Sequence, residues 1–512
     1  MDILRKLGQL VMPRLDFRDG DPMPRARGLV SRFNVGGFLL FGGDVILVSE
    51  SIKELQRLSR VPLFFAVDAE RGVGQIVEGG ALFPYAMAFG AAADERLLER
   101  EARLIAREMR SIGLNMLLAP VVDVNTDPRN PIINVRAYGD DPAGVARLAQ
   151  AFIKGAADGG VLACAKHFPG HGGVDTDSHV SLPRSLSTRE DLLRCDLVPF
   201  RETIASGVPV VMIAHLALPR IDVSGRPVTL SPEAIEGILR GELGFSGLVL
   251  TDSFRMDALS GLGGEADLAA AAIAAGCDFI LDPKEPEALI EDLSLMLSSG
   301  GGLNELEIES HVDRITGFKK SHLGRAAPKG HRFDAGEAAE QLNREVAEGS
   351  VCLVKGGPLR AKRAALYIMD STGAVGTGND VTGKEFLSRL AESGVECSPH
   401  YVGLSGEDAP LLPHEGFSGG AVVALVYTGV AAWKGYTELP AAFQSLLNRL
   451  MGCGVESALV SFGSPYVFSG FKGFHTIVAA FDRMPEMERA AAGVLLGSLK
   501  PRGRMPVGAG FL

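Results

Sequence analysis

The chain has 512 residues, a net charge of −11 and a composition that is 46% hydrophobic and 22% charged. That length exceeds what one hydrophobic core normally supports, so we expect two domains. The acidic balance argues against a basic surface that binds nucleic acid or anionic membranes. No apolar run of about 18 residues occurs, and residues 1–17 lack the uninterrupted apolar core of a signal peptide. We therefore expect a cytoplasmic protein with neither a membrane nor a nucleic acid as partner.

The six cysteines form no CxxC pair, and their spacing matches no zinc pattern. Cys164 and Cys352 lie inside apolar runs, where a small buried thiol is the expected role. This cysteine usage suits a reducing compartment.

Short apolar runs alternate with helix-like segments through the first 320 residues. Strands buried on both faces and a strand–helix alternation are typical of a parallel sheet covered by helices. Seven such units and a weak eighth predict a (β/α)8 barrel of the TIM type over residues 1–322. The predicted strands are Gly37–Phe41, Leu63–Val67, Met116–Val122, Leu162–Ala165, Val210–Ala214, Leu248–Thr251 and Phe279–Leu281, with helices including Asp94–Ile112 and Glu190–Ser206.

Polar residues follow most of these predicted strands. Because the carboxyl ends of barrel strands open at one mouth, where barrel enzymes carry out their chemistry, these side chains should lie close together. Six strand ends in register are hard to explain as surface residues. The residues are Asp68, Asp123, Lys166 with His167, His215, Asp252 and Asp282.

The composition changes after the predicted barrel. Residues 324–336 (GRAAPKGHRFDAG) are typical of a linker, and we set the linker at 323–345. Strand and helix patterns then restart, which predicts a smaller α/β sandwich domain over 346–512. Its predicted strands are Ser350–Val354, Ala364–Met369, Gly420–Val426, Ala458–Phe462 and Thr476–Ala480.

One motif in this second part resembles a phosphate-binding loop. Residues 378–385 (GNDVTGKE) match GxxxxGK, but Glu385 stands where Ser or Thr would bind magnesium. No clear apolar strand precedes the motif. We interpret it as a glycine-rich turn that opens a helix.

Residues 166–183 (KHFPGHGGVDTDSHVSLP) contain three of the chain's ten histidines. The glycines and Pro169 predict a loop that leaves a strand end. Asp177 and His179 are two residues apart, so in a bent loop the carboxylate can orient the imidazole, which suits a general acid/base. Two other interpretations stay open here: a solvated histidine-rich loop, and a zinc site formed by His167, His171 and His179, which no ligand spacing supports.

Asp252 lies in GLVLTDSFRMDAL (247–259), directly after a buried strand. A carboxylate there can cap the following helix, or it can act as a nucleophile at the barrel mouth. A retaining glycosidase needs an attacking carboxylate and a proton donor on opposite faces of the sugar. Groups that could hold a hydroxylated small ligand are Asp68, Arg136, Lys166, His167 and His215.

Together these stretches resemble glycoside hydrolase family 3, in its bacterial β-N-acetylglucosaminidase branch. The resemblance covers most of residues 1–310 and is strongest in KHFPGHG (166–172), DSH (177–179) and the strand-end TDS (251–253). It also includes FAVDAE (65–70) and APVVDVNTDPRNPIINVRAYGDDP (119–142). Residues 340–512 resemble the C-terminal sandwich domain of the family more loosely.

The resemblance implies a retaining β-N-acetylhexosaminidase that removes terminal β-linked N-acetylglucosamine from cell-wall or chitin-type fragments. It implies no metal and no organic cofactor, and a small carbohydrate as the binding partner. The sequence does not indicate an oligomeric state. The implied roles are nucleophile for Asp252, acid/base dyad for Asp177 and His179, and sugar binding for Asp68, Arg136, Lys166 and His167, to which we add His215.

The sequence departs from the branch pattern at several positions. Ser253 stands where Asp is usual, Ile76 replaces a common arginine, and Gly173 and Val174 replace common Asp and Thr. These changes bear on substrate preference more than on reaction type.

Three alternatives share the fold. The first is a β-N-acetylglucosaminide phosphorylase, because a neutral histidine does not repel an incoming phosphate. The second is a β-glucosidase, which Ile76 permits. The third is a non-catalytic carbohydrate-binding homologue, which the intact set of Asp177, His179 and Asp252 disfavours.

Overall fold

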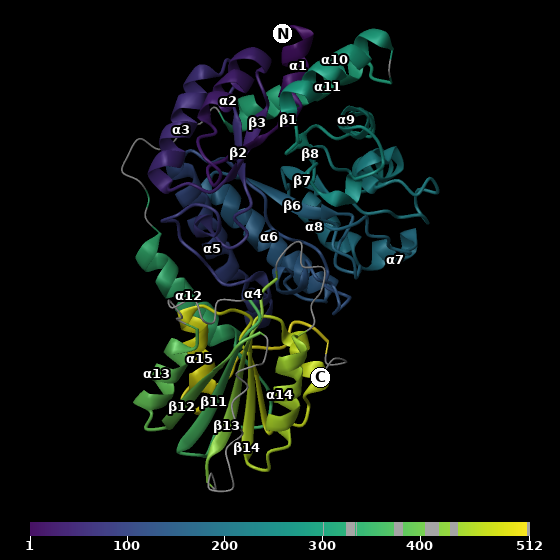
Figure 1. Cartoon of the computed structure of the whole chain (residues 1–512). Helices are drawn as coiled ribbons and strands as arrows, with labels where there is room; N and C mark the ends of the chain where they lie inside the picture. The colour runs from purple at the N-terminus through teal and green to yellow at the C-terminus, as the bar shows by residue number, and fades with distance from the viewer. Residues whose placement is uncertain are drawn as a thin grey trace. The chain divides into compact units, whose positions relative to one another are not determined.

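The structure, a computed structural model, describes residues 1–300, 302–323, 333, 335–372, 382–404, 419–430 and 439–508. The chain forms two compact units (Figure 1). Both units are discontinuous in sequence, and the second takes two segments from the first half of the chain. Unit 1 consists of Met1–Phe83, Leu98–Asp127 and Val145–Ala339, and unit 2 of Pro84–Leu97, Pro128–Gly144 and Glu340–Leu512.

Unit 1 is built on a curled parallel sheet with helices packed outside it (Figure 1). Seven strands pair in the order β2-β3-β4-β5-β6-β7-β8. A parallel bridge joins Leu250 to Phe279, and β9 pairs with β1, so parallel pairing continues beyond β8. The strands are β1 (Val11–Met12), β2 (Arg14–Asp16), β3 (Gly37–Phe41), β4 (Phe64–Val67), β5 (Met116–Leu117), β6 (Leu162–Phe168), β7 (Val210–Ile213), β8 (Leu248–Thr251) and β9 (Ile280–Leu281).

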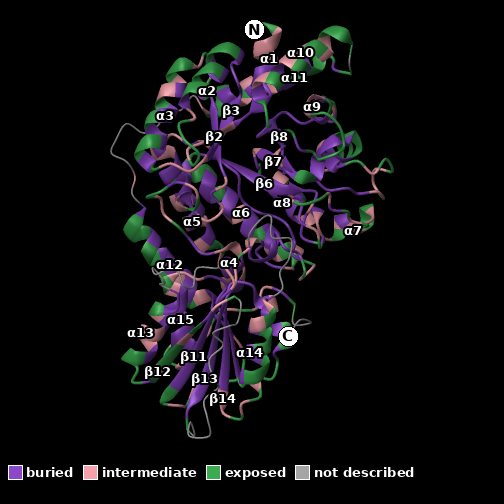
Figure 2. Ribbon diagram, viewed as in Figure 1, coloured by how far each residue is buried: buried purple, intermediate pink, exposed green. Residues whose placement is uncertain are grey.

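Burial explains why these runs form strands. Every residue of β4, β7 and β8 is buried, as expected for strands covered on both faces. Figure 2 shows the central strands of both units as buried. Gly37 begins β3 at a point with no room for a side chain, because an added Cβ would lie 2.8 Å from the Cβ of Phe64. Close packing of neighbouring strands therefore requires glycine at this position.

Two predicted strand boundaries were wrong in a way that affects the site. The predicted strand Met116–Val122 has regular strand structure only through Leu117, although Ala119, Pro120 and Val122 still form backbone hydrogen bonds with β6. The predicted strand Leu162–Ala165 instead continues to Phe168. Lys166 and His167 therefore belong to the strand and not to the loop after it.

The helices of unit 1 begin at local capping signals where the sequence provides them. The Asp44 side chain accepts the N–H groups of Ile46 and Leu47, which fixes the start of α3. The predicted helix Glu190–Ser206 is two helices, because the chain leaves helical geometry at Cys195. The α-helices are α1 (Ile3–Gln9), α2 (Met23–Gly28), α3 (Val45–Leu58), α5 (Glu95–Ile112), α6 (Pro142–Gly159), α7 (Arg189–Arg194), α8 (Leu197–Ala205), α9 (Glu265–Ala274), α10 (Pro286–Ser299) and α11 (Glu305–His322).

Unit 2 contains a six-stranded sheet in the order β10-β15-β14-β13-β11-β12, in which only β10 is antiparallel to its neighbour. The five parallel strands have a doubly wound order. Figure 1 shows α13 and α15 on one side of the sheet and α14 on the other. The elements are α4 (Ala86–Ala92), α12 (Gly336–Ser350), β10 (Cys352–Lys355), β11 (Arg363–Asp370), α13 (Lys384–Glu392), β12 (Glu396–Val402), β13 (Ala421–Tyr427), α14 (Ala441–Met451), β14 (Glu456–Phe462), β15 (Thr476–Ala479) and α15 (Pro485–Leu495).

In the described part of the second half of the chain, one strand was not predicted from the sequence. Strand β12 is at the edge of the sheet, and its residues are mostly exposed or partly exposed. An edge strand needs no continuous apolar run and tolerates Pro399, so its sequence lacks the usual signal.

The glycine-rich motif at 378–385 lies partly outside the described residues. In the described part, the Glu488 carboxylate accepts the N–H of Gly383 at 2.8 Å and that of Glu385 at 3.0 Å. These amides are therefore already bonded to a protein carboxylate. The interpretation as a turn that opens a helix, here α13, is confirmed for these residues.

Two further sequence expectations concern burial. All six cysteines are free thiols, and Cys164 and Cys352 are buried as predicted. Among the described residues, no helix is both long enough and apolar enough to cross a membrane.

Candidate active site

Lys166 projects from β6 and connects two carboxylates at the carboxyl end of β4. The lysine is 2% exposed, and its Nζ lies 2.5 Å from Oδ1 of Asp68 and 2.6 Å from Oε1 of Glu70. The Asp68 side chain keeps 37% of its surface exposed. One ammonium between two carboxylates fixes both, and the partly exposed Asp68 can accept hydrogen bonds from hydroxyl groups.

His167, the next residue of β6, pairs with a fully buried carboxylate. Its Nδ1 lies 2.7 Å from Oδ2 of Asp123, whose Oδ1 accepts the N–H of His171 at 2.7 Å. Burial by itself would raise the pKa of Asp123, but the charges and hydrogen bonds of His167 and His171 outweigh it and lower that pKa. The ionised Asp123 keeps a proton on Nδ1 of His167 and fixes the orientation of the ring.

His171 connects the two ends of the histidine-rich loop. Its Nε2 lies 3.1 Å from Oγ of Ser178, and burial lowers its pKa to about 4. Gly172, the next residue, lies against the backbone of Val124, where an added Cβ would overlap the carbonyl. A neutral, enclosed His171 favours a structural role in this loop.

Asp177 and His179 form a direct pair, as the sequence predicts. Nδ1 of His179 lies 2.9 Å from Oδ1 of Asp177, and the same oxygen accepts the backbone N–H of His179 at 2.8 Å. Asp177 is 2% exposed, whereas the His179 side chain is 21% exposed. The enclosed carboxylate therefore holds the ring, and Nε2 is the nitrogen that can exchange a proton with a ligand.

Asp252 directly follows β8, and its Oδ1 accepts the N–H of Ser253 at 2.8 Å. Burial would raise the pKa of Asp252, but the charges of three imidazoles and this N–H outweigh it and lower that pKa. The imidazoles are His167, His215 and His179. Asp252 is therefore an ionised carboxylate at neutral pH, and it lies near all three rings.

His215 lies behind Asp252 and is fully buried. Its Nε2 lies 3.2 Å from the carbonyl oxygen of Ser253, and its Nδ1 lies 2.7 Å from Oγ1 of Thr229. Burial lowers the pKa of His215 more than the charge of Asp252 raises it, so the ring is neutral. Because a carbonyl only accepts, Nε2 carries the proton, and the Thr229 hydroxyl lies within hydrogen-bond distance of both Nδ1 and the carbonyl oxygen of Ala214. Both nitrogens bond within the protein, which favours a supporting role over the predicted contact with substrate.

Unit 1 thus brings together all the predicted site residues except one. Arg136 ends a short 3-10 helix (Asn134–Arg136) in unit 2, where its Nη1 donates to the carbonyl of Ile132 at 2.9 Å. Its predicted role in sugar binding stays a prediction. The described part of the chain contains no group of three His, Cys, Asp or Glu side chains arranged to hold a metal ion.

The sequence interpretation missed several residues of this site. Glu70 had a usable signal, because it lies two residues after Asp68, and Asp123 was noted only as a strand end. Thr229 had no signal, since its contact with His215 depends on the path of the connection after β7. Of the positions that depart from the branch pattern, Val174 is buried, with 4% of its surface exposed.

Comparisons with known proteins show the family of this chain. Residues 3–318 match the family described as Glycosyl hydrolase family 3 N terminal domain. Beta-hexosaminidase A of Pseudoalteromonas piscicida is 33% identical over 329 residues, or 58% of this chain, and the match spans only 55% of that protein. The Beta-N-acetylglucosaminidase/beta-glucosidase of Cellulomonas fimi is 28% identical over 517 residues, covering 95% of this chain and 91% of that protein. The solved structure of a glycoside hydrolase family 3 beta-N-acetylglucosaminidase from Paenibacillus sp. is 30% identical, with a TM-score of 0.84 over 99% of each chain.

Proposed function

Because this chain belongs to glycoside hydrolase family 3, we propose that it is a retaining β-N-acetylhexosaminidase that releases terminal β-linked N-acetylglucosamine. The observation that carries the proposal is the Asp177–His179 pair in the same unit as the ionised Asp252. A proton donor and an attacking carboxylate are the two groups that a retaining glycosidase needs. The names of the Pseudoalteromonas, Cellulomonas and Paenibacillus relatives support the choice of sugar.

The proposed reaction has two steps. In the first, Asp252 attacks the anomeric carbon while the imidazolium of His179 donates its Nε2 proton to the leaving oxygen. A covalent glycosyl–Asp252 ester forms, and His179 becomes neutral. In the second, His179 takes a proton from water, the hydroxide attacks the anomeric carbon, and Asp252 leaves as a carboxylate. Two displacements at one carbon retain the β configuration.

The remaining groups would bind the sugar. We infer that Asp68 accepts from its hydroxyls while Lys166, which also pairs with Glu70, holds that carboxylate in place. The Nε2 side of His167 offers a further polar contact, since Nδ1 is bonded to Asp123. This arrangement supports a polar small-molecule site.

We further infer that the curled sheet of unit 1 is the predicted (β/α)8 barrel, with β1 and β2 as two halves of one strand. The pairing of β9 with β1 and the bridge from β8 toward β9 support closure. In such a barrel, the residues after the strands share one mouth. The predicted cytoplasmic location and a role in recycling cell-wall fragments stay predictions.

The experiment is a direct assay of the purified chain with 4-nitrophenyl N-acetyl-β-glucosaminide and with the corresponding glucoside. We expect the N-acetyl substrate to be preferred and Asp252→Ala to lose essentially all turnover. Asp252→Ala should keep the melting temperature near that of the wild type, which excludes misfolding as the cause. Near-normal turnover by a folded Asp252→Ala variant would reject the assignment of the nucleophile.

A second candidate function is β-glucosidase activity, which the double name of the Cellulomonas relative favours. A higher kcat/KM on the glucoside than on the N-acetyl substrate would establish it. A third is phosphorolysis, because the neutral His179 of the second step carries no charge that would repel phosphate. If a sugar 1-phosphate forms only when phosphate is added, the reaction is phosphorolysis and not hydrolysis.

A further inference from the structure

Ser253 connects the proposed nucleophile to a buried charge cluster, with three of its polar groups engaged at once. Its N–H donates to Asp252 at 2.8 Å, and its carbonyl accepts from Nε2 of His215 at 3.2 Å. Its hydroxyl donates to Oδ2 of Asp282 at 2.8 Å and accepts the N–H of Arg255 at 3.2 Å. The position of Ser253 is therefore fixed from three directions, and Asp252 is held by the same residue.

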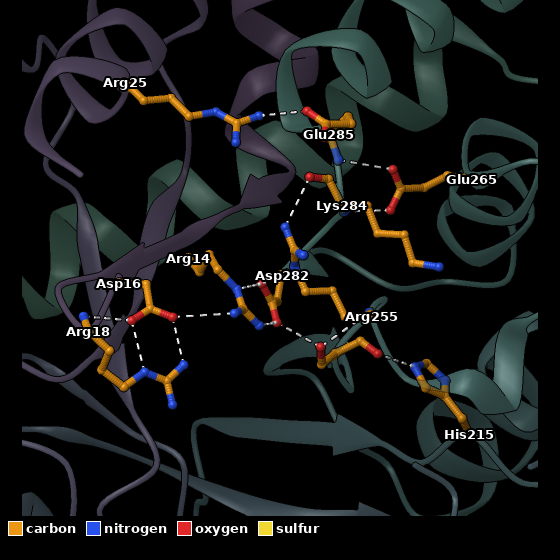
Figure 3. Close-up of polar contacts among 11 residues, drawn as sticks. Arg14, Asp16, Arg18, Arg25, His215, Arg255, Glu265, Asp282, Lys284 and Glu285 are labelled. Carbon is orange, nitrogen blue, oxygen red and sulfur yellow. Dashed lines mark hydrogen bonds and ion pairs between the residues drawn. The ribbon is translucent and has the colours of Figure 1, made fainter. Parts of the chain in front are cut away.

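Asp282 is the centre of that cluster (Figure 3). It follows β9 directly and is 1% exposed. Arg14 on β2 donates to both of its carboxylate oxygens at 2.7 Å, and Nε of Arg255 forms an ion pair with it at 3.3 Å. A bidentate arginine fixes the plane of a carboxylate, so the oxygen that accepts from Ser253 is itself held in place.

This arrangement has an energetic cost. Asp282 has a backbone φ of 54°, in the left-handed region that residues other than glycine rarely adopt. Its carboxylate is also buried, which requires desolvation of the charge. Strained residues of this kind persist where the surrounding structure holds them, and they concentrate at functional sites.

A purely architectural role would explain only part of these contacts. The Arg14–Asp282 pair by itself connects β2 to the end of β9. Strands β8 and β9 are already connected without Ser253, because Leu281 donates its N–H to Oγ1 of Thr251 at 3.0 Å. The additional bond from the Ser253 hydroxyl joins no further strands. Its effect is to fix the residue that holds the Asp252 carboxylate.

We propose that Ser253 and Asp282 are positioning residues for the nucleophile: Asp282, held by Arg14 and Arg255, fixes Ser253, and Ser253 aims the carboxylate of Asp252. This inference rests on the proposed glycosidase function. Neither residue forms or breaks a bond in the reaction. Their contribution is to the rate at which Asp252 attacks, because a displacement of about 1 Å at the reacting atoms can cost about 100-fold in rate.

The test compares Ser253→Ala, Ser253→Thr and Asp282→Asn by single-turnover release of 4-nitrophenol, which reports the attack step directly. Ser253→Ala should lower that rate about 10- to 100-fold with KM nearly unchanged, because the hydroxyl is bonded to Asp282 and Arg255 within the protein. Ser253→Thr keeps the hydroxyl and should restore most of the rate. Asp282→Asn keeps an acceptor oxygen but weakens the pair with Arg14, so its rate should lie between the two.

The matched control is Asp16→Asn. Asp16 forms an ion pair with the same Arg14 at 3.3 Å and has no hydrogen bond to Ser253. Its attack rate should stay within about twofold of the wild type, because Arg14 keeps both of its bonds to Asp282 when the Asp16 charge is removed. If Asp282→Asn fails to fold, the Ser253→Ala and Ser253→Thr pair still decides the question.

The outcomes separate the two proposals. If the wild type is active and folded Ser253→Ala attacks at the wild-type rate, the positioning role is overturned and the glycosidase function stays intact. An equal loss in Ser253→Ala and Ser253→Thr would also overturn it, because the hydroxyl would then be irrelevant. A folded wild type that cleaves no β-glycoside would instead reject the proposed function itself.

Discussion

The Asp177–His179 pair allows the sharpest test of the proposed mechanism, through the substitution Asp177→Asn. Asparagine has nearly the same shape and can still accept one hydrogen bond. It has no charge, however, to stabilise the imidazolium that forms when His179 holds its second proton. The enclosed Asp177 is 2% exposed, so water cannot replace the lost carboxylate efficiently.

The expected magnitude follows from the contacts that are lost. One Asp177 oxygen holds both Nδ1 of His179 at 2.9 Å and its backbone N–H at 2.8 Å. General acid catalysis contributes about 100- to 10,000-fold in rate, or about 3–5 kcal/mol of transition-state stabilisation. We expect Asp177→Asn to lose most of this range on a natural disaccharide of N-acetylglucosamine.

The assay compares two substrates that differ only in how much protonation the leaving group needs. The disaccharide requires a proton donor, whereas 4-nitrophenol leaves readily without one. Asp177→Asn should therefore lower kcat/KM less than about tenfold on the nitrophenyl substrate, well below the loss on the disaccharide. Equal losses on both substrates would refute the assignment and leave the pair with a purely structural role.

Three further predictions concern buried charges. Burial lowers the pKa of Lys319 from 10.5 to about 7. Between pH 7 and pH 10.5, Lys319 therefore holds a proton in the unfolded chain but not in the folded chain. The free energy of unfolding should therefore rise from pH 7 to pH 10, and urea titrations of Lys319→Met should show no such rise. Lys166→Met should lower the free energy of unfolding by about 3 kcal/mol, because Asp68 and Glu70 lose their shared counter-charge; an unchanged urea midpoint would contradict this. Glu488→Ala leaves the first amides of α13 and the Tyr427 hydroxyl without an acceptor and should cost about 2–3 kcal/mol by the same measurement, with Glu488→Gln less affected.

The sequence predicted the parts of this protein that depend on neighbouring residues. Strand β8 and the position of Asp252 directly after it were correct, because four consecutive buried residues followed by a carboxylate form a local pattern. The Asp177–His179 pair was also correct, since two residues in one bent loop can contact each other without help from the rest of the fold. The edge strand β12 was missed, because exposed strands carry no apolar run.

The tertiary structure decided which distant residues support these groups. Ser253 meets Asp282 across 29 positions, and Arg14 reaches the same carboxylate across 268. Likewise, the segments 84–97 and 128–144, which include Arg136, pack with the second unit although their sequence lies among the strands of the first. No periodicity or spacing encodes such contacts, because they depend on where separate strands end in space. The sequence by itself therefore predicted the candidate reacting groups, and the folded chain determined how Asp252, His179 and His215 are held.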